Sequence, residues 1–100
     1  MNLLAYNIIN FVEGFDRSKS AMIVTSKAEE VCSALSEEFG CGITIMDAKG
    51  YYSNSSKKVV YIVVNRFQIT KMKTVVHEHD HSAYITISEV ADIFKNNIDK

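Results

Sequence analysis

The residues of this chain that could do chemistry are concentrated in two segments. The first is His77-Glu78-His79-Asp80-His81, in which three imidazoles and two carboxylates follow one another. Such side chains suit zinc and other divalent metals. Helical spacing argues against a shared site, because His79 continues the apolar stripe of a predicted helix while His77 lies on another side of it. We interpret the segment as a solvated helix end and predict no metal site formed by His77, His79 and His81 together.

The second segment is the polar run 48–58, which joins two predicted strands. Its tyrosines can stack, its serines and asparagine can form hydrogen bonds, and its lysines can meet an anion. A hairpin connection usually has about two to five residues, and longer loops in compact domains often carry function. Two interpretations stay open, a loop that contacts a ligand and a mobile loop that contacts none.

A third feature is the pair Gly40 and Gly42, separated by one cysteine. The pair precedes a strand, whereas a phosphate-cradling glycine turn leads into a helix. We therefore interpret it as a helix end followed by a tight entry into a strand. No nucleophile elbow, nucleotide-binding loop or paired carboxylates are recognisable by spacing. The sequence predicts neither an enzyme nor a bound cofactor.

Composition sets the frame for these segments. The chain has 100 residues, of which 47% are hydrophobic, so we expect a single folded domain. A net charge of −1 argues against nucleic-acid binding, which needs a basic face. The two cysteines fit no metal spacing and predict free thiols in a reducing compartment. No apolar run approaches the roughly 20 residues of a membrane span, and we see no signal peptide.

Hydrophobic periodicity places these segments on elements. Two capping boxes are predicted, Ser26 with Glu29 and Asn65 with Gln68, and Gly40 is expected to end the first of the two helices that they open. The expected elements are a helix over 3–15, a strand over 21–25, a helix over 26–39, strands over 43–46 and 59–64, a helix over 65–79, a strand over 83–87 and a short helix from Ser88.

This order predicts an α+β fold, the ferredoxin-like βαββαβ arrangement. Right-handed crossovers place both helices on one face of a four-stranded antiparallel sheet, with strand 59–64 in the middle. We expect the domain to cover 20–95, preceded by a helix and linker over 1–19 and followed by a frayed tail over 96–100. The helix 3–15 either packs on its own domain or connects it to a membrane or a partner.

The second face of that sheet is predicted to be unusually apolar. A face in contact with water should alternate apolar and polar residues along each strand, and an exposed apolar patch usually marks an interface. Tyr61 and Tyr84 could also form an RNA-binding aromatic platform, but the surrounding strand lacks the required glycine-aromatic pattern. We predict a homo-oligomer, a dimer or trimer, unless the helix 3–15 covers the face. Its expected interface residues are Met46, Tyr61, Val63 and Tyr84.

Three segments together resemble the C-terminal soluble domain of YitT-type bacterial membrane proteins, a domain of unknown function. They are Gly40-Cys-Gly-Ile-Thr-Ile-Met-Asp-Ala-Lys-Gly-Tyr-Tyr52, Lys57-Lys-Val-Val-Tyr-Ile-Val-Val-Asn-Arg66 and Asp80-His-Ser-Ala-Tyr-Ile-Thr-Ile-Ser-Glu-Val90. Ala48 and His81 depart from the family pattern, and the tail lacks the expected glycine-rich close. The resemblance implies a parent protein with several membrane helices, of which this chain is the part on the cytoplasmic side, and a fold similar to trimeric PII-type signalling proteins.

The resemblance also implies a role and a site. The role is regulatory ligand sensing, with a small anionic metabolite or nucleotide bound between subunits; the alternative is an oligomerisation module without a ligand. The expected ligand-binding residues are Gly40, Gly42, Thr44, Gly50, Tyr52, Ser53 and Asp80. We expect the start of strand 43–46 and the turn at Asp80 to lie at one end of the sheet and the loop 48–58 at the other. A neighbouring subunit would then have to supply the loop.

Overall fold

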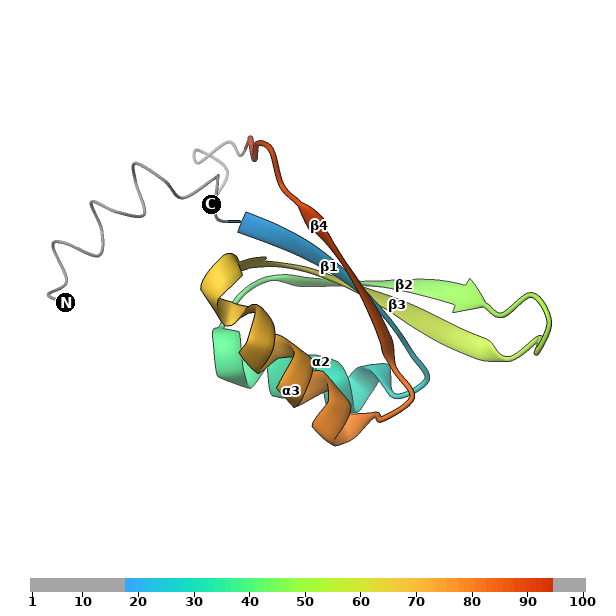
Figure 1. Cartoon of the computed structure of the whole chain (residues 1–100). Coiled ribbons are helices and arrows are strands. Elements are labelled where there is room, and N and C mark those ends of the chain that lie inside the picture. The colour runs from blue at the N-terminus through green and yellow to red at the C-terminus, as the bar shows by residue number, and fades with distance from the viewer. Residues whose placement is uncertain (1–17, 95–100) are drawn as a thin grey trace, which may run out of the picture.

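A four-stranded antiparallel sheet with two helices on one face forms the domain (Figure 1). The structure is a computed structural model and describes residues 18–94, so the predicted helix 3–15 and the predicted tail 96–100 lie outside the described residues. The elements are β1 (Ser18–Thr25), α2 (Ala28–Phe39), β2 (Ile43–Lys49), β3 (Ser56–Asn65), η2 (Arg66–Gln68), α3 (Ile69–His79) and β4 (Tyr84–Glu89).

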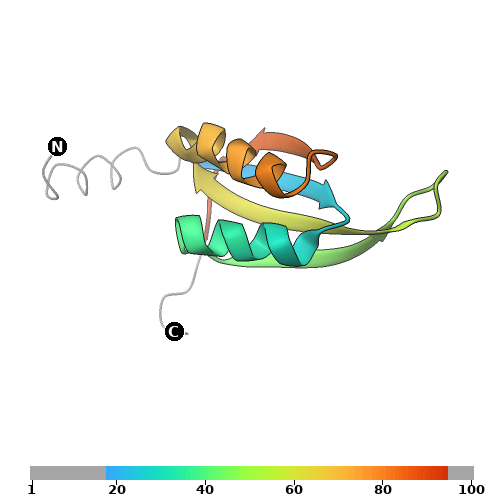
Figure 2. The ribbon, with the colours of Figure 1, turned by 90° about the horizontal axis from the view of Figure 1, so that it is seen from below.

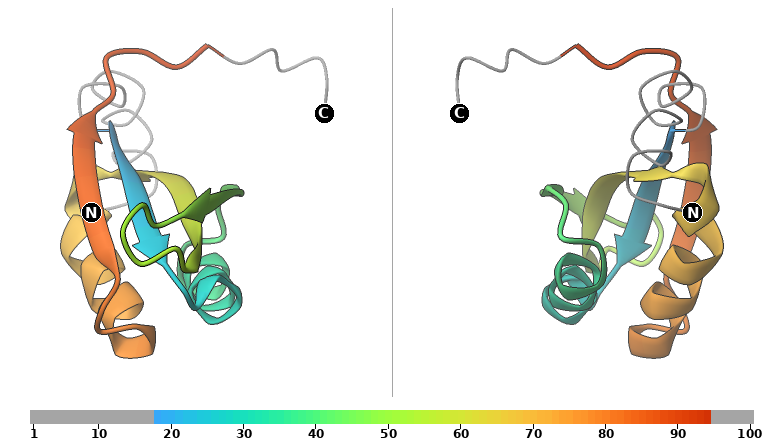
Figure 3. Two further views of the ribbon diagram at one scale, coloured as in Figure 1. Left: turned by 90° about the vertical axis from the view of Figure 1, so that its right-hand side faces the viewer. Right: turned by 90° about the vertical axis from the view of Figure 1, so that its left-hand side faces the viewer.

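The strand order β2-β3-β1-β4 confirms the predicted ferredoxin-like fold, with β3 inside the sheet. α2 and α3 lie side by side against the same face of the sheet, and the end-on views show that face as the only one they cover (Figures 2 and 3). In the part of the chain that the structure describes, no helix is both long enough and apolar enough to span a bilayer.

The direction of each strand decides which turns are neighbours. β3 is antiparallel to both β1 and β2, and β4 is antiparallel to β1. Each crossover helix therefore returns the chain to the end from which the preceding strand started. We call one end the hairpin end, which carries the end of β1, the β2–β3 connection and the α3–β4 turn. The other, the terminal end, carries Ser18, the α2–β2 turn, η2 and the end of β4.

The core lies between the sheet and the two helices. Alternate residues of β1 and β3 point inward, among them Ile23, Val60 and Ile62, and are at most 1% exposed. The predicted helical stripes supply the opposite layer, since Val31, Leu35, Met72, Val75 and Val76 are buried. Apolar side chains at these spacings bury one face of each element, which is the main driving force for the fold.

Helix ends follow the sequence signals in part. Gly40 ends α2 with φ 60°, a left-handed backbone that suits glycine. The Asn65–Gln68 capping box is present and opens the short turn η2 ahead of α3. The predicted Ser26 capping box is wrong: Lys27 occupies the N-cap position of α2 without a side-chain hydrogen bond. Thr25 Oγ1 instead accepts from the Lys27 amide at 2.9 Å, so the preceding strand supplies the cap.

The predicted helix from Ser88 is also wrong within the described residues. Ser88 and Glu89 belong to β4, and residues 90–94 have no regular secondary structure. The Val90 amide donates to the Ser18 carbonyl at 3.3 Å, which continues the pairing of β4 with β1. Ile93 and Phe94 are 40% and 95% exposed. A helix of this length needs a buried apolar face to persist, and neither side chain finds one here.

Candidate functional site

The β2–β3 hairpin extends beyond the rest of the sheet and is the most prominent feature of the hairpin end (Figures 1 and 2). We call residues 47–58 the arm. Its strands are longer than predicted, because Asp47, Ala48 and Lys49 pair with Lys58, Lys57 and Ser56. The loop is therefore 50–55, not 48–58. These polar positions belong to a two-stranded ribbon with both faces in water, so they leave no apolar alternation for a sequence pattern to detect.

Local hydrogen bonds define the tip of the arm. The Gly50 amide donates to the Ser55 carbonyl at 3.1 Å, and the Asn54 amide donates to the Gly50 carbonyl at 2.9 Å. Asn54 adopts φ 57°, a left-handed conformation that asparagine tolerates better than most residues. The hydroxyls of Ser53 and Ser55 lie 2.8 Å apart. The tip thus holds a defined shape without packing on the core.

Two tyrosines lie at the tip of the arm. Tyr51 is 89% exposed and Tyr52 is 95% exposed. Their ring centroids lie 4.9 Å apart at an interplanar angle of 80°, an edge-to-face pair. Such rings add little to the stability of the isolated domain, because almost none of their surface is removed from water. Their apolar faces remain free to meet another molecule.

The arm is cationic. It holds Lys49, Lys57 and Lys58 against one acidic residue, Asp47, in a chain whose net charge is −1. The Lys58 ammonium pairs with Asp47 across the two strands. The hydrogen bond from Lys58 and its positive charge lower the pKa of Asp47, and the same contact raises the pKa of Lys58. Lys49 and Lys57 have no ion-pair partner among residues 18–94, so their charge stays available.

Asp80 lies at the same end of the sheet, but its carboxylate already accepts hydrogen bonds from residues of the domain. Its side chain is buried, accepts from the Thr25 hydroxyl at 2.6 Å and accepts from the Ser82 amide at 3.0 Å. The hydrogen bond from Thr25 is the largest cause of its lowered pKa, with the Ser82 amide and the Lys27 charge adding to it against the opposing effect of burial. Asp80 therefore ties the α3–β4 turn to the β1–α2 turn.

The structure divides the predicted ligand residues between the two ends. Gly40 and Gly42 lie at the terminal end, whereas Gly50, Tyr52, Ser53 and Asp80 lie at the hairpin end. The expectation that Asp80 shares an end with Gly40 and Gly42 was wrong, because α3 runs back along β3 and delivers its last turn to the hairpin end. Thr44, near the start of β2, is paired with Tyr61 on the uncovered face. Within one chain these seven residues do not converge.

The uncovered face of the sheet carries two apolar rows. Met46, Val59, Val24 and Tyr84 are cross-strand neighbours in one row, and Thr44, Tyr61, Met22 and Thr86 in the next. Met22 is 42% exposed, Met46 40%, Tyr61 37% and Tyr84 62%. Val63 is half-buried one pair further along β3. This face matches the apolar surface that the sequence predicted.

His77 and His79 each make a hydrogen bond to a different backbone carbonyl. The His77 Nε2–H donates to the Ala83 carbonyl at 3.1 Å, and the His79 Nδ1–H donates to the Val75 carbonyl at 3.0 Å. Within residues 18–94 no three side chains of histidine, cysteine, aspartate or glutamate are placed to hold a metal ion.

One surface feature escaped the sequence analysis. A groove of about 580 Å³ runs between α2 and α3, with Ala34 and Val75 among its lining residues. The acidic side chains that line it are Glu29, Glu30, Glu37, Glu38 and Glu78. On α2 alone, Glu29, Glu30, Glu37 and Glu38 form an ordinary solvated face. Only the packing of α3 beside α2 turns that face into one wall of a groove.

Comparisons with known proteins bear on the family and the fold of this chain. The sequence pattern of the DUF2179 family, described as "Uncharacterized protein conserved in bacteria", matches residues 41–94. Relatives from Bacillus subtilis (strain 168) are named UPF0750 membrane proteins, and YitT and YxkD are among them. YitT is 36% identical over 75 residues, which are 75% of this chain and 27% of YitT. YxkD is 25% identical over 95 residues, which are 94% of this chain and 34% of YxkD. The chain thus spans about a quarter of YitT and about a third of YxkD.

Solved structures that share the fold include a DUF2179 protein and a PII protein. A DUF2179 protein from Eubacterium ventriosum superimposes with a TM-score of 0.61 at 25% identity, covering 73% of this chain and 100% of that one. The PII protein of Arabidopsis thaliana, bound to citrate, superimposes with a TM-score of 0.69 at 19% identity, covering 80% of this chain and 83% of that one. The second likeness concerns the fold alone.

Proposed function

Because this chain belongs to the DUF2179 family and its relatives are membrane proteins, we propose that it is the regulatory, ligand-sensing module of a bacterial membrane protein. The parent's membrane helices lie in the part of its length that this chain does not span. The module resides on the cytoplasmic side. Its described cysteines, Cys32 and Cys41, are free thiols, which is the usual state in a reducing compartment.

The arm is the observation that carries the proposal. It presents two almost fully exposed tyrosines beside two lysines that have no ion-pair partner among residues 18–94, on a ribbon that contributes nothing to the core of the described domain. Exposed aromatic rings bind by stacking, and ammonium groups bind carboxylates and phosphates. The ligand is therefore a small anion with a flat or apolar part, such as a nucleotide or a carboxylate metabolite. Asp80 takes no part in binding it, because its carboxylate already serves the fold.

Self-association through the uncovered sheet face completes the proposal. The two apolar rows on that face are what a second copy would bury. Gly40, Gly42 and Thr44 stay in the ligand site only if a neighbouring copy brings its terminal end to the arm. Assembly therefore decides whether the site consists of the arm alone or of parts from two chains.

A thermal-shift screen tests ligand sensing directly. The panel holds nucleotides, amino acids and di- and tricarboxylates, including citrate because the Arabidopsis PII structure contains it. Binding to the folded state raises stability by mass action, so at least one compound should raise the melting temperature by several degrees. The double variant Tyr51→Ser/Tyr52→Ser should lose that response, while Thr70→Ser on the exposed surface of α3 should retain it.

The second candidate function is an oligomerisation module without a ligand. The apolar face favours it independently of the arm, since self-association needs only that face. If no compound in the panel stabilises the wild-type chain, this function replaces ligand sensing.

A further inference from the structure

We propose that the arm of one copy docks into the groove between α2 and α3 of a second copy. The two surfaces are opposite in charge. The arm carries three lysines and one aspartate, whereas the groove is lined by five glutamates and a histidine, with no lysine or arginine. Charge complementarity of this kind steers association and fixes orientation.

The size of the groove is compatible with the same pairing. Its volume of about 580 Å³ is within the range of about 300–1,000 Å³ in which pockets hold drug-sized ligands, so it is large enough for two tyrosine side chains. Ala34 and Val75 give the groove an apolar part against which the rings of Tyr51 and Tyr52 can pack. The lysines, placed behind the rings on the arm, then meet the glutamates along its rim.

The positions of two glutamates on α2 form an independent argument. Glu29 and Glu30 lie in the first turn of α2, where the helix dipole favours negative charge. Glu37 and Glu38 lie in the last turn, where the dipole disfavours it, and that turn contains no basic residue. Among residues 18–94 neither Glu37 nor Glu38 has an ion-pair partner. A positively charged partner at this end of the groove would offset that unfavourable placement.

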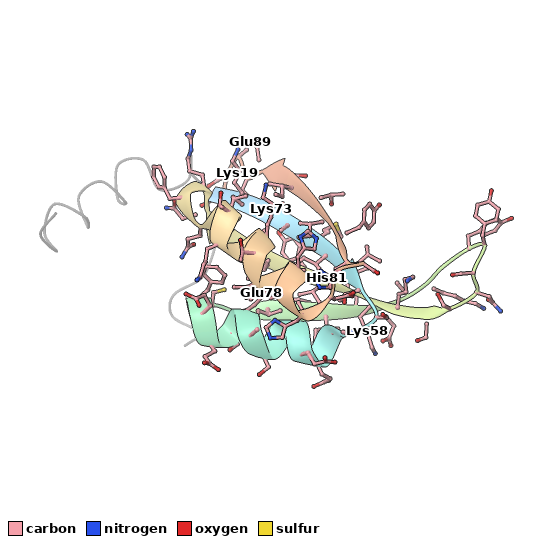
Figure 4. All side chains as sticks on the ribbon, turned by 60° about the horizontal axis from the view of Figure 1, so that its bottom comes forward. Lys19, Lys58, Lys73, Glu78, His81 and Glu89 are labelled. Atoms are coloured by element: carbon pink, nitrogen blue, oxygen red, sulfur yellow. The ribbon has the colours of Figure 1, made fainter. Side chains whose placement is uncertain are left out.

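The partner arm must come from another chain. The arm continues the sheet away from the helices and beyond their ends (Figures 1 and 2). Lys58 lies at the base of the arm, beside the first turn of α2, whereas Glu78 lies on α3 (Figure 4). Docking of an arm into the next copy's groove is a heterologous contact, which closes into a ring or continues as a chain. It uses neither of the apolar rows on the opposite face, so both contacts can form at once.

A two-by-two binding experiment on the 100-residue chain tests the contact without any ligand, so its result is separate from that of the thermal-shift screen. The groove variant is Glu37→Lys/Glu38→Lys, and the arm variant is Tyr51→Ser/Tyr52→Ser. Both immobilised chains carry the arm substitutions, which prevent them from docking with one another, and they differ only in having an intact or a substituted groove. Both analytes carry the groove substitutions, and they differ only in having an intact or a substituted arm.

Only the combination of an intact immobilised groove with an intact analyte arm should bind above the level of the other three, which report association through the sheet face. Raising the salt concentration from 50 to 500 mM should weaken this binding about tenfold, because exposed charges are screened. Equal binding in all four combinations would overturn the proposal. So would stronger binding in the combination of intact groove and intact arm that does not change with the salt concentration. If a variant lowers the melting temperature, Glu37→Gln/Glu38→Gln and Tyr51→Ser alone replace the substitutions, with a smaller difference expected in the same direction.

Discussion

The Asp80 carboxylate fastens two turns that lie far apart in the sequence. It accepts from Thr25, 55 positions away, and Thr25 in turn accepts from the Lys27 amide at the start of α2. No spacing rule relates Thr25 to Asp80, so the sequence indicated a polar residue in a turn but not its partner. Gly40 differs in this respect, because a glycine directly after an apolar helical stripe predicts its own left-handed backbone.

Replacing Asp80 by asparagine should destabilise the fold by about 1–3 kcal/mol at pH 7, since it disturbs a buried, charge-assisted hydrogen bond. The folded-state pKa of Asp80 is lowered, so the ionised form is favoured by folding. Its stabilisation is fully present above the unfolded-state pKa of about 3.9 and is lost as the pH falls below that value. Urea denaturation of both proteins at pH 7 and pH 3 should show the difference shrinking at pH 3. A difference that grows on acidification would contradict the assignment.

Gly40 and Gly42 form a matched pair for the next prediction. Gly40→Ala should cost about 1–2 kcal/mol because its φ of 60° strains a residue with a Cβ. Gly42→Ala should change stability by less than about 0.5 kcal/mol, since nothing lies within 4 Å of an added Cβ there. Chemical denaturation of the two variants measures both values. Equal losses would mean that the α2–β2 turn differs from the one described.

At the scale of elements, periodicity located all four strands and both helices, because each buries one apolar face. Periodicity gave wrong bounds or a wrong element where no apolar face is buried. The arm strands are polar on both faces and are joined by their ladder and the Lys58–Asp47 pair. Residues 90–94 have helical spacing, but the described part of the chain buries neither Ile93 nor Phe94. The arm's length was therefore underestimated, and the terminal helix was wrongly predicted.

Substituting both arm tyrosines by serine should leave the melting temperature within about 2 °C of wild type, because surface substitutions usually change stability by less than about 0.5 kcal/mol. Scanning calorimetry at neutral pH measures this. The comparison is Val60→Ala, further along β3, a fully buried residue whose truncation should lower the melting temperature by several degrees. A large drop in the serine variant would show that the rings pack on the domain and are not free to bind.

At the scale of the whole molecule, residues 18–94 present two surfaces that the fold leaves unexplained, the apolar sheet face and the acidic groove. The sequence predicted the first, because the strands lack the alternation of apolar and polar residues that a face in water requires, and that lack is visible residue by residue. It could not predict the second, which needs two helices side by side. It also placed Asp80 at the wrong end of the sheet, since strand direction was not followed through the second crossover.

Assembly should depend on the apolar rows. Met22 lies at their centre, directly opposite Tyr61 and Thr86. Met22→Glu places a charge in that surface. In a chain whose arm also carries Tyr51→Ser/Tyr52→Ser, so that the arm does not dock into a groove, Met22→Glu should convert the oligomer to a monomer in sedimentation equilibrium at 100 mM salt. Thr70→Glu in the same arm variant, on the exposed side of α3, should leave the assembly intact. A wild-type chain that is monomeric at high micromolar concentration, or a Met22→Glu chain of the arm variant that still assembles, would contradict self-association through this face.

The most direct measurement of ligand sensing is a titration followed by amide resonances. The chain is labelled with ¹⁵N and titrated with the compound that stabilises it most in the thermal-shift screen, with an unrelated neutral metabolite as the control. The account predicts saturable shifts of the arm amides, largest at Tyr51, Tyr52 and Lys57, with the Asp80 amide little changed. Saturable shifts confined to the core or to the α2–α3 groove, or no shifts from any compound at millimolar concentration, would contradict it.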